Sequence, residues 1–226
     1  MTRALASLDG VSVGDAFGER FFGPHELVQP WVEQRILPRA PWGYTDDTEM
    51  TLSVVQVLED HGHVDPDALA LLFSKRYRRD KNRGYGGTAH DILWKLGLGL
   101  PWREVSSEVF EGQGSMGNGA AMRVAPLGAY FAGDLPRVVA EARASAEVTH
   151  MHPEGQAGAI AIAVAAVWCA ARHLDSFEEA LWCTVAGFGD RDTTCAMVGG
   201  IVALSAGRAS IPAPWLSARE PLRRRV

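Results

Sequence analysis

The chain has 226 residues, of which 47% are hydrophobic and 22% charged, and its formal net charge is −5. This length suits one domain with a buried core. The weakly negative charge argues against a general nucleic-acid-binding protein, and the most apolar segment, residues 157–171, is too short to span a membrane.

Apolar residues recur at helical spacing along the chain. After Thr45, the residues Met50, Val54 and Leu58 follow this spacing, and Gly62 predicts the end of that helix. Four further helices are expected in the first half of the chain: one from Pro66 through Phe73, one that contains Ile92 and Leu96, one from Pro101 through Val109, and one within the apolar run 120–131. Four more are expected at 135–148, 156–172, 177–186 and 193–206, followed by a last short turn at Pro212 and Trp215.

No sustained alternation of polar and apolar residues interrupts this pattern, so we predict an all-α bundle. No repeat or long linker divides the chain, which we interpret as a single domain, 1–226, with a basic and frayed tail at 217–226. Cys169, Cys183 and Cys195 have no metal-ligand spacing, and we expect reduced, buried thiols. No signal-peptide pattern is present at the N-terminus, and we expect a cytoplasmic monomer.

Two pairs of carboxylates flanked by hydroxyls lie near opposite ends of the chain. The first pair is in Thr45-Asp46-Asp47-Thr48 and the second in Asp190-Arg191-Asp192-Thr193-Thr194. Carboxylate and hydroxyl oxygens suit Mg²⁺ or Mn²⁺, so clusters that meet in the fold could hold two ions, as in a two-metal hydrolase. Either cluster alone is more typical of a helix N-cap. Their occurrence together favours a metal site.

Three loops carry further candidate groups. Glycines in Gly114-Ser115-Met116-Gly117-Asn118-Gly119 allow backbone N–H groups to approach a phosphate or diphosphate, although a plain turn is the simpler interpretation. Arg83-Gly84-Tyr85-Gly86 is a second turn, in which Tyr85 could line a site. His150 could act as a hydrogen-bonding or acid–base group, or be an exposed imidazole in a loop.

Five short motifs occur in order along the chain: Gly14-Asp15-Ala16-Phe17-Gly18, Thr45-Asp46-Asp47-Thr48, residues 114–123, Thr149-His150 and Asp190-Arg191-Asp192-Thr193. Together they resemble the ADP-ribosylglycohydrolase family, which includes the dinitrogenase-reductase-activating glycohydrolases. The resemblance covers residues 10–215. Residues 83–86 followed by 114–123 look most like the branch that removes ADP-ribose from serine and degrades poly(ADP-ribose).

This resemblance implies a compact orthogonal helical bundle with two Mg²⁺ or Mn²⁺ ions, which cleaves the glycosidic bond at the distal ribose of ADP-ribose conjugates such as an ADP-ribosylated protein. Asp46 or Asp47 would be the catalytic carboxylate. The implied metal ligands are Thr45, Asp46, Asp47, Asp190, Asp192 and Thr193. The implied substrate-binding residues are Gly114, Ser115, Met116, Gly117 and Asn118 for the diphosphate, His150 for the distal ribose, and Arg83, Gly84, Tyr85 and Gly86 at the entrance or the phosphates. Asp15 would order the first motif from a turn between two glycines.

Two departures from the family pattern stand out. Members commonly carry a glutamate seven residues after the aspartate of the first motif, and here that position is Phe22, with Glu19 and Glu26 out of register. The segment between His150 and Asp190 is also shorter than usual, which implies a more open pocket.

Two classes of function therefore stay open. The retained acid clusters favour a hydrolase, because four clustered carboxylates without metal would be costly to bury. Phe22 and the shortened segment favour a non-catalytic module that binds ADP-ribose or a related nucleotide. A metal-dependent phosphohydrolase of another helical class would need paired His-Asp ligands, and His90-Asp91 is the only adjacent pair, with no partner histidine in register.

Overall fold

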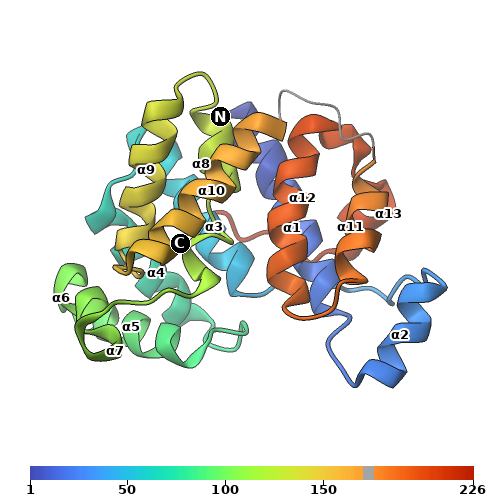
Figure 1. The fold of residues 1–226 in the computed structure, drawn as a ribbon, viewed down its shortest axis with the longest axis horizontal. Helices are drawn as coiled ribbons and strands as arrows, with labels where there is room; N and C mark the ends of the chain where they lie inside the picture. The colour runs from blue at the N-terminus through green and yellow to red at the C-terminus, as the bar shows by residue number, and fades with distance from the viewer. Residues whose placement is uncertain (170–175) are drawn as a thin grey trace.

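The computed structural model describes residues 1–169 and 176–226, with the side chains of 166–169 excepted. This part of the chain is helical, which confirms the all-α fold, and its one β-bridge joins Trp42 to Arg219 (Figure 1). The α-helices are α1 (Thr2–Glu19), α2 (His25–Glu33), α3 (Asp46–His61), α4 (Pro66–Arg79), α5 (Gly87–Gly97), α6 (Trp102–Ser107), α7 (Val109–Gly112), α8 (Ala125–Tyr130), α9 (Leu135–Glu147), α10 (Pro153–Cys169), α11 (Phe177–Val185), α12 (Arg191–Ser205) and α13 (Ala213–Ala218), and the 3₁₀-helices are η1 (Asn118–Ala120) and η2 (Arg208–Ser210).

Helices α1 and α12 come from opposite ends of the chain and pack side by side in the middle of the molecule (Figure 1). Glycines allow this close approach. A Cβ atom on Gly14 would lie 2.0 Å from the carbonyl oxygen of Cys195, and one on Gly18 would lie 2.2 Å from that of Arg191. The glycines beside Asp15 therefore serve helix packing, and the prediction of a turn at Asp15 is wrong, because this motif lies inside α1.

An aromatic cluster holds α1 against the C-terminal helices. The ring of Phe17 stacks on Trp215 with centroids 4.6 Å apart and meets the edge of Trp182 at 5.0 Å. All three side chains are buried. Such aromatic contacts add to the free energy gained from burying the rings, so this cluster holds α1 against α11 and α13.

Local sequence sets both ends of α3 as predicted. The Thr45 hydroxyl accepts a hydrogen bond from the Asp47 N–H at 3.3 Å, and Gly62 ends the helix in the left-handed conformation with φ of 72°. Asp65 caps α4 in the same way. The first acid cluster is therefore a helix N-cap, and this does not prevent it from also being a site.

Several segments differ from the predicted helices. The helix expected from Pro101 through Val109 ends at Ser107, because Phe110 and Glu111 adopt left-handed φ values of 53° and 59°. Helix α2 is not predicted by the sequence pattern. The predicted end of the 156–172 helix lies outside the described residues.

The C-terminal tail is not frayed. The guanidinium of Arg76, buried on α4, donates hydrogen bonds to the backbone carbonyls of Arg223 at 2.8 Å and Arg224 at 2.9 Å. Arg225 also donates to Asp60 at 2.6 Å. The sequence could not reveal this attachment, because its partners lie on α3 and α4, far from the tail in the chain.

The cysteines are also not uniformly buried. Cys195 is buried as expected, whereas Cys183 is exposed, and the side chain of Cys169 lies outside the described part of the structure. Among the described helices, none combines the length and apolar character that a bilayer crossing requires.

Candidate active site

A cavity of about 510 Å³ lies where the N-terminal ends of α3 and α12 meet the two Gly-rich loops. This volume is in the range of small-molecule binding sites. Most of the predicted site residues line it: Asp46, Asp47, Gly84, Gly86, Ser115, Met116, Gly117, Asn118, His150, Asp190, Asp192 and Thr193. The fold thus brings residues from both acid clusters, both Gly-rich loops and the segment of His150 to one place.

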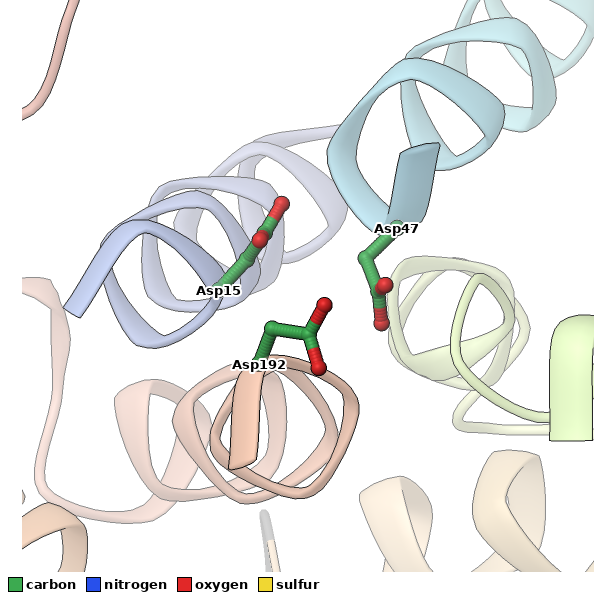
Figure 2. Close-up of side chains that lie close together, drawn as sticks. All are labelled: Asp15, Asp47 and Asp192. Carbon is green, nitrogen blue, oxygen red and sulfur yellow. The ribbon is translucent and has the colours of Figure 1, made fainter. Parts of the chain in front are cut away.

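The two acid clusters meet inside this cavity. Figure 2 shows Asp47 at the start of α3 and Asp192 at the start of α12, with Asp15 of α1 beside them. Carboxylate oxygens of these three residues lie within 4.8 Å of one another, which is close enough for a shared metal ion. The hydroxyl of Thr193 also donates to Oδ2 of Asp47 at 3.2 Å, so the ends of the chain are in direct contact.

The acidic side chains lack positively charged partners within the described residues. No lysine or arginine there forms an ion pair with Asp46, Asp47 or Asp192, and Oδ1 of Asp47 is buried without a hydrogen-bond partner. Burial, and then the charge of Asp15, raises the pKa of Asp46 to about 7. Burial, and then a hydrogen bond with Asp190, raises the pKa of Asp192 to about 8. A divalent cation would supply the missing charge, and the donor set of carboxylates and hydroxyls suits Mg²⁺ or Mn²⁺.

Asp15 is the organiser of the Thr45–Thr48 turn. Its carboxylate accepts hydrogen bonds from the hydroxyls of Thr45 at 2.9 Å and Thr48 at 2.5 Å, and from both backbone N–H groups. Burial raises the pKa of Asp15 to about 6, and these hydrogen bonds oppose the rise. Both carboxylate oxygens of Asp15 are therefore occupied by hydrogen bonds from Thr45 and Thr48. Because these two threonines flank Asp46 and Asp47, Asp15 fixes the position of both aspartates.

The Gly-rich loop at 114–119 forms another part of the cavity wall. The Oγ of Ser115 accepts a hydrogen bond from the Gly117 N–H at 3.2 Å, and the Asn118 amide donates to Oδ2 of Asp190 at 2.6 Å. The imidazole of His150 lies against Gly119, where a Cβ atom would be 3.1 Å from Cε1. The absence of a side chain at Gly119 therefore allows the loop to lie close to His150. Through Asn118 the loop is also hydrogen-bonded to the second acid cluster.

Four predicted site residues do not line the cavity, namely Thr45, Arg83, Tyr85 and Gly114. Arg83 donates to the carboxylate of Asp80 at 2.9 Å, forms an ion pair with Glu220, and is therefore turned away from the expected phosphate region. Its carbonyl accepts a hydrogen bond from the Asp46 N–H at 2.6 Å, so it supports the site through its backbone. Tyr85 is buried, and Gly114 shapes its loop with φ of 78°.

The apolar wall of the cavity is not among the predicted site residues. Its members are Met50, Ile92, Leu93, Phe110 and Met122. Phe110 is 57% exposed, which is unusual for a phenylalanine, and it follows the broken helix at the rim. The available signal is an aromatic residue directly before the Glu111-Gly112 helix stop. The helical pattern of the other four marks them only as core residues.

Comparison with known proteins identifies the family. The sequence model described as ADP-ribosylglycohydrolase matches residues 1–166 and 163–226. The chain belongs to the ADP-ribosylglycohydrolase family. This confirms the family suggested by the five motifs.

Named relatives agree with this family. The chain is 33% identical over 181 residues to the human protein "ADP-ribosylhydrolase ARH3", which covers 73% of this chain and 49% of the relative. It is 34% identical over 180 residues to the protein of the same name from Xenopus tropicalis, with 73% and 49% covered. This ADP-ribosylglycohydrolase family member thus spans about half the length of these curated relatives.

A solved structure described as "ADP-ribosylglycohydrolase-related protein complex" has the same fold. It superimposes with a TM-score of 0.69 over 96% of this chain and 92% of that chain, at 23% identity. This similarity confirms the bundle type that is implied for an ADP-ribosylglycohydrolase.

The position at which the resemblance implies a glutamate is occupied by Phe22, shortly after the end of α1. Phe22 is 48% exposed and does not line the cavity. Glu19, at the end of α1, does not line the cavity either, although its charge contributes to the raised pKa of Asp46.

Proposed function

We propose that the chain is a metal-dependent hydrolase that cleaves the glycosidic bond at the distal ribose of an ADP-ribose conjugate. One observation carries this assignment: the carboxylates of Asp47 and Asp192 meet in a cavity with an unpartnered buried oxygen, opposite a Gly-rich loop. The family and the relatives named ADP-ribosylhydrolase support the same substrate class.

The metal ligands we propose are Thr45, Asp46, Asp47, Asp190, Asp192 and Thr193. Two Mg²⁺ or Mn²⁺ ions held there would supply Lewis-acid polarisation and a water of lowered pKa. Cleavage at the anomeric carbon of ribose develops positive charge on the sugar, which carboxylate oxygens beside the sugar would stabilise.

The rest of the cavity binds and orients the substrate. Backbone N–H groups around Gly117, with the side chains of Ser115 and Asn118, would donate hydrogen bonds to the diphosphate, and His150 provides a polar group beside them. The apolar wall that includes Phe110 excludes water from one side. Holding the sugar in one orientation lowers the barrier by reducing the entropy lost in reaching the transition state.

The leaving group needs a proton, and the sequence leaves Asp46, Asp47 or a water molecule at the metal site for this role. Both carboxylates line the cavity. Phe22 offers no carboxyl group for this task, and Glu19 at the end of α1 is the further candidate.

The alternative is a non-catalytic module that binds ADP-ribose. The exposed Phe22 in the glutamate position favours it, because one acidic group of the family pattern is absent. The cytoplasmic location, the monomeric state, the single domain and the more open pocket stay predictions.

A release assay separates the two functions. Free ADP-ribose is measured from defined serine-, arginine- and acyl-linked substrates with Mg²⁺ or Mn²⁺, and binding of ADP-ribose is measured by calorimetry. We expect metal-dependent release that is lost in Asp192→Asn and retained in Asp91→Asn, an exposed acid on α5. Binding without release from any substrate would establish the module instead, and absence of both would reject both functions.

A further inference from the structure

A buried arginine lies directly behind the cavity and has no acidic partner. Arg123 is fully buried, and among the described residues it forms no ion pair. Burial lowers its pKa to about 9, so its position is costly to the free energy of folding. This energetic cost suggests that Arg123 has a role in the site besides packing.

The guanidinium of Arg123 connects both sides of the site. Nη1 donates to the carbonyl of Gly119 in the Gly-rich loop at 3.1 Å. Nη2 donates to the carbonyl of Ser145 at 2.7 Å and to the hydroxyl of Thr149 at 3.0 Å. The same side chain thus fixes the loop and the residue that precedes His150.

The Thr149 hydroxyl links Arg123 to His150. Its oxygen lies 2.7 Å from Nδ1 of His150. A guanidinium can only donate, so the threonine oxygen accepts from Arg123. Within the described residues, Nδ1 of His150 is the only acceptor within hydrogen-bond distance of the hydroxyl proton. The threonine therefore donates to Nδ1, which leaves the ring proton on Nε2.

The other ring nitrogen faces the ligand space. His150 lines the cavity, and a Cβ atom added at Gly117 would lie 3.6 Å from Nε2. Burial, and then the charge of Arg123, lowers the pKa of His150 to about 3, so the imidazole is neutral at physiological pH. A neutral ring with its proton on Nε2 presents one N–H donor beside the Gly-rich loop.

We propose that Arg123, acting through the Thr149 hydroxyl, fixes His150 as the Nε2–H tautomer, so that His150 donates a hydrogen bond to an oxygen of the bound ligand. Arg123 and Thr149 are positioning residues. The expected acceptor is a phosphate or ribose oxygen, and this part rests on the proposed function. His150 then serves as a fixed donor and does not exchange protons with the substrate.

The tautomer can be measured without any ligand. In protein with ¹⁵N-labelled histidine, long-range ¹H–¹⁵N NMR distinguishes the two ring nitrogens, and His150→Gln identifies the signals of His150. We expect the proton on Nε2 in the wild type and in Thr149→Ser, and a mixture of tautomers in Thr149→Val. Thr184→Val is the matched control, because that hydroxyl bonds a carbonyl within α11, away from the site. A proton on Nδ1 in the wild type overturns the inference, even if Thr149→Val does not fold.

Two further measurements test the chain of contacts. Arg123→Lys keeps the charge but loses the planar fork, so we expect a mixture of tautomers there as well, and an unchanged tautomer would remove Arg123 from this role. The Kd for ADP-ribose should rise about tenfold in Thr149→Val and recover in Thr149→Ser. If the wild type does not bind ADP-ribose, the proposed function fails, while the tautomer measurement still decides the role of Thr149.

Discussion

The hydroxyl of Thr193 lies 3.2 Å from the carboxylate of Asp47, although 146 residues separate them in the chain. This contact joins the first turn of α12 to the first turn of α3. It exists because α1 packs against α12 and its Asp15 holds the turn before α3. A metal site at this point therefore depends on all three helices.

Metal binding should depend on both acid clusters. Mg²⁺ or Mn²⁺ at about 100 times its Kd should stabilise the wild type by about 2.7 kcal/mol, because the ion binds only the folded state. For a chain of this length the melting temperature should rise by roughly 5–10 °C, as measured by scanning calorimetry. Asp46→Ala or Asp192→Ala should abolish the rise, whereas Asp91→Asn should keep it. A wild type without any metal-dependent rise would exclude the binuclear site.

The stability of the metal-free protein should fall as pH rises from 6.5 to 8. The folded-state pKa of Asp46 is about 7 and that of Asp192 about 8, both above the ordinary value of 3.8. The folded state therefore binds more protons than the unfolded state in this range, and the free energy of unfolding decreases with pH. His150, with its lowered pKa, acts in the opposite direction up to about pH 7.5, but within this range its effect is smaller than that of the two aspartates together.

Urea unfolding in EDTA at the two pH values measures this dependence. Saturating Mg²⁺ should remove the loss at pH 8, because the ion binds the deprotonated carboxylates. A metal-free protein that is more stable at pH 8 than at 6.5 would show that the carboxylates are charged and compensated in some other way.

The Gly-rich loop should bind the diphosphate. Ser115→Ala should weaken ADP-ribose binding by roughly 1–2 kcal/mol, the contribution of a hydrogen bond to a charged group. Gly117→Val should weaken binding more, because the valine side chain would block the ligand. The fold should tolerate this change, because the nearest atom to the added Cβ is Ser115 Oγ at 3.5 Å. Calorimetry checks both, with Gly133→Val as the control, where no atom lies within 4 Å of the added Cβ. Unchanged affinity in a folded Gly117→Val protein would remove the loop from the site.

The metal ion nearest Phe22 should be bound more weakly than the other ion, because a phenylalanine side chain cannot ligate a metal. Activity should then need more free metal than in a relative that carries the glutamate. Phe22→Glu should tighten metal binding if the loop keeps its position, as measured by calorimetry and by metal titration of activity. Two tight, equivalent sites that do not respond to this substitution would assign the role to Glu19 or Glu26, and Glu19→Gln would then separate these two.

The close packing of α1 on α12 should not tolerate a side chain at Gly14. A Cβ there would lie 2.0 Å from a backbone oxygen, so the helices must separate. We expect Gly14→Ala to lower the free energy of unfolding by about 1–3 kcal/mol or more, and to weaken metal binding because Asp15 moves with α1. Gly133→Ala serves as the control in urea unfolding. An unaltered stability would contradict the packing role.

The helical class, the family and most residues around the cavity can be deduced from the amino-acid sequence alone. Helical spacing, caps such as Thr45 and stops such as Gly62 are local, and the same residues act in the structure through bonds to near neighbours. The acid clusters and the loop at 114–119 were recognisable only in combination, because each of them alone is typical of a helix N-cap or a turn.

How these residues act together depends on contacts between distant parts of the chain. The direction of Arg83, the attachment of the tail to Arg76 and the contact of Thr149 with both Arg123 and His150 each depend on partners distant in the chain or on rotamers set by packing. The glycines around Asp15 suggested a turn, because a glycine required by close helix packing and a glycine required by backbone conformation look identical in sequence. Burial distinguishes them, and burial is a property of the whole fold.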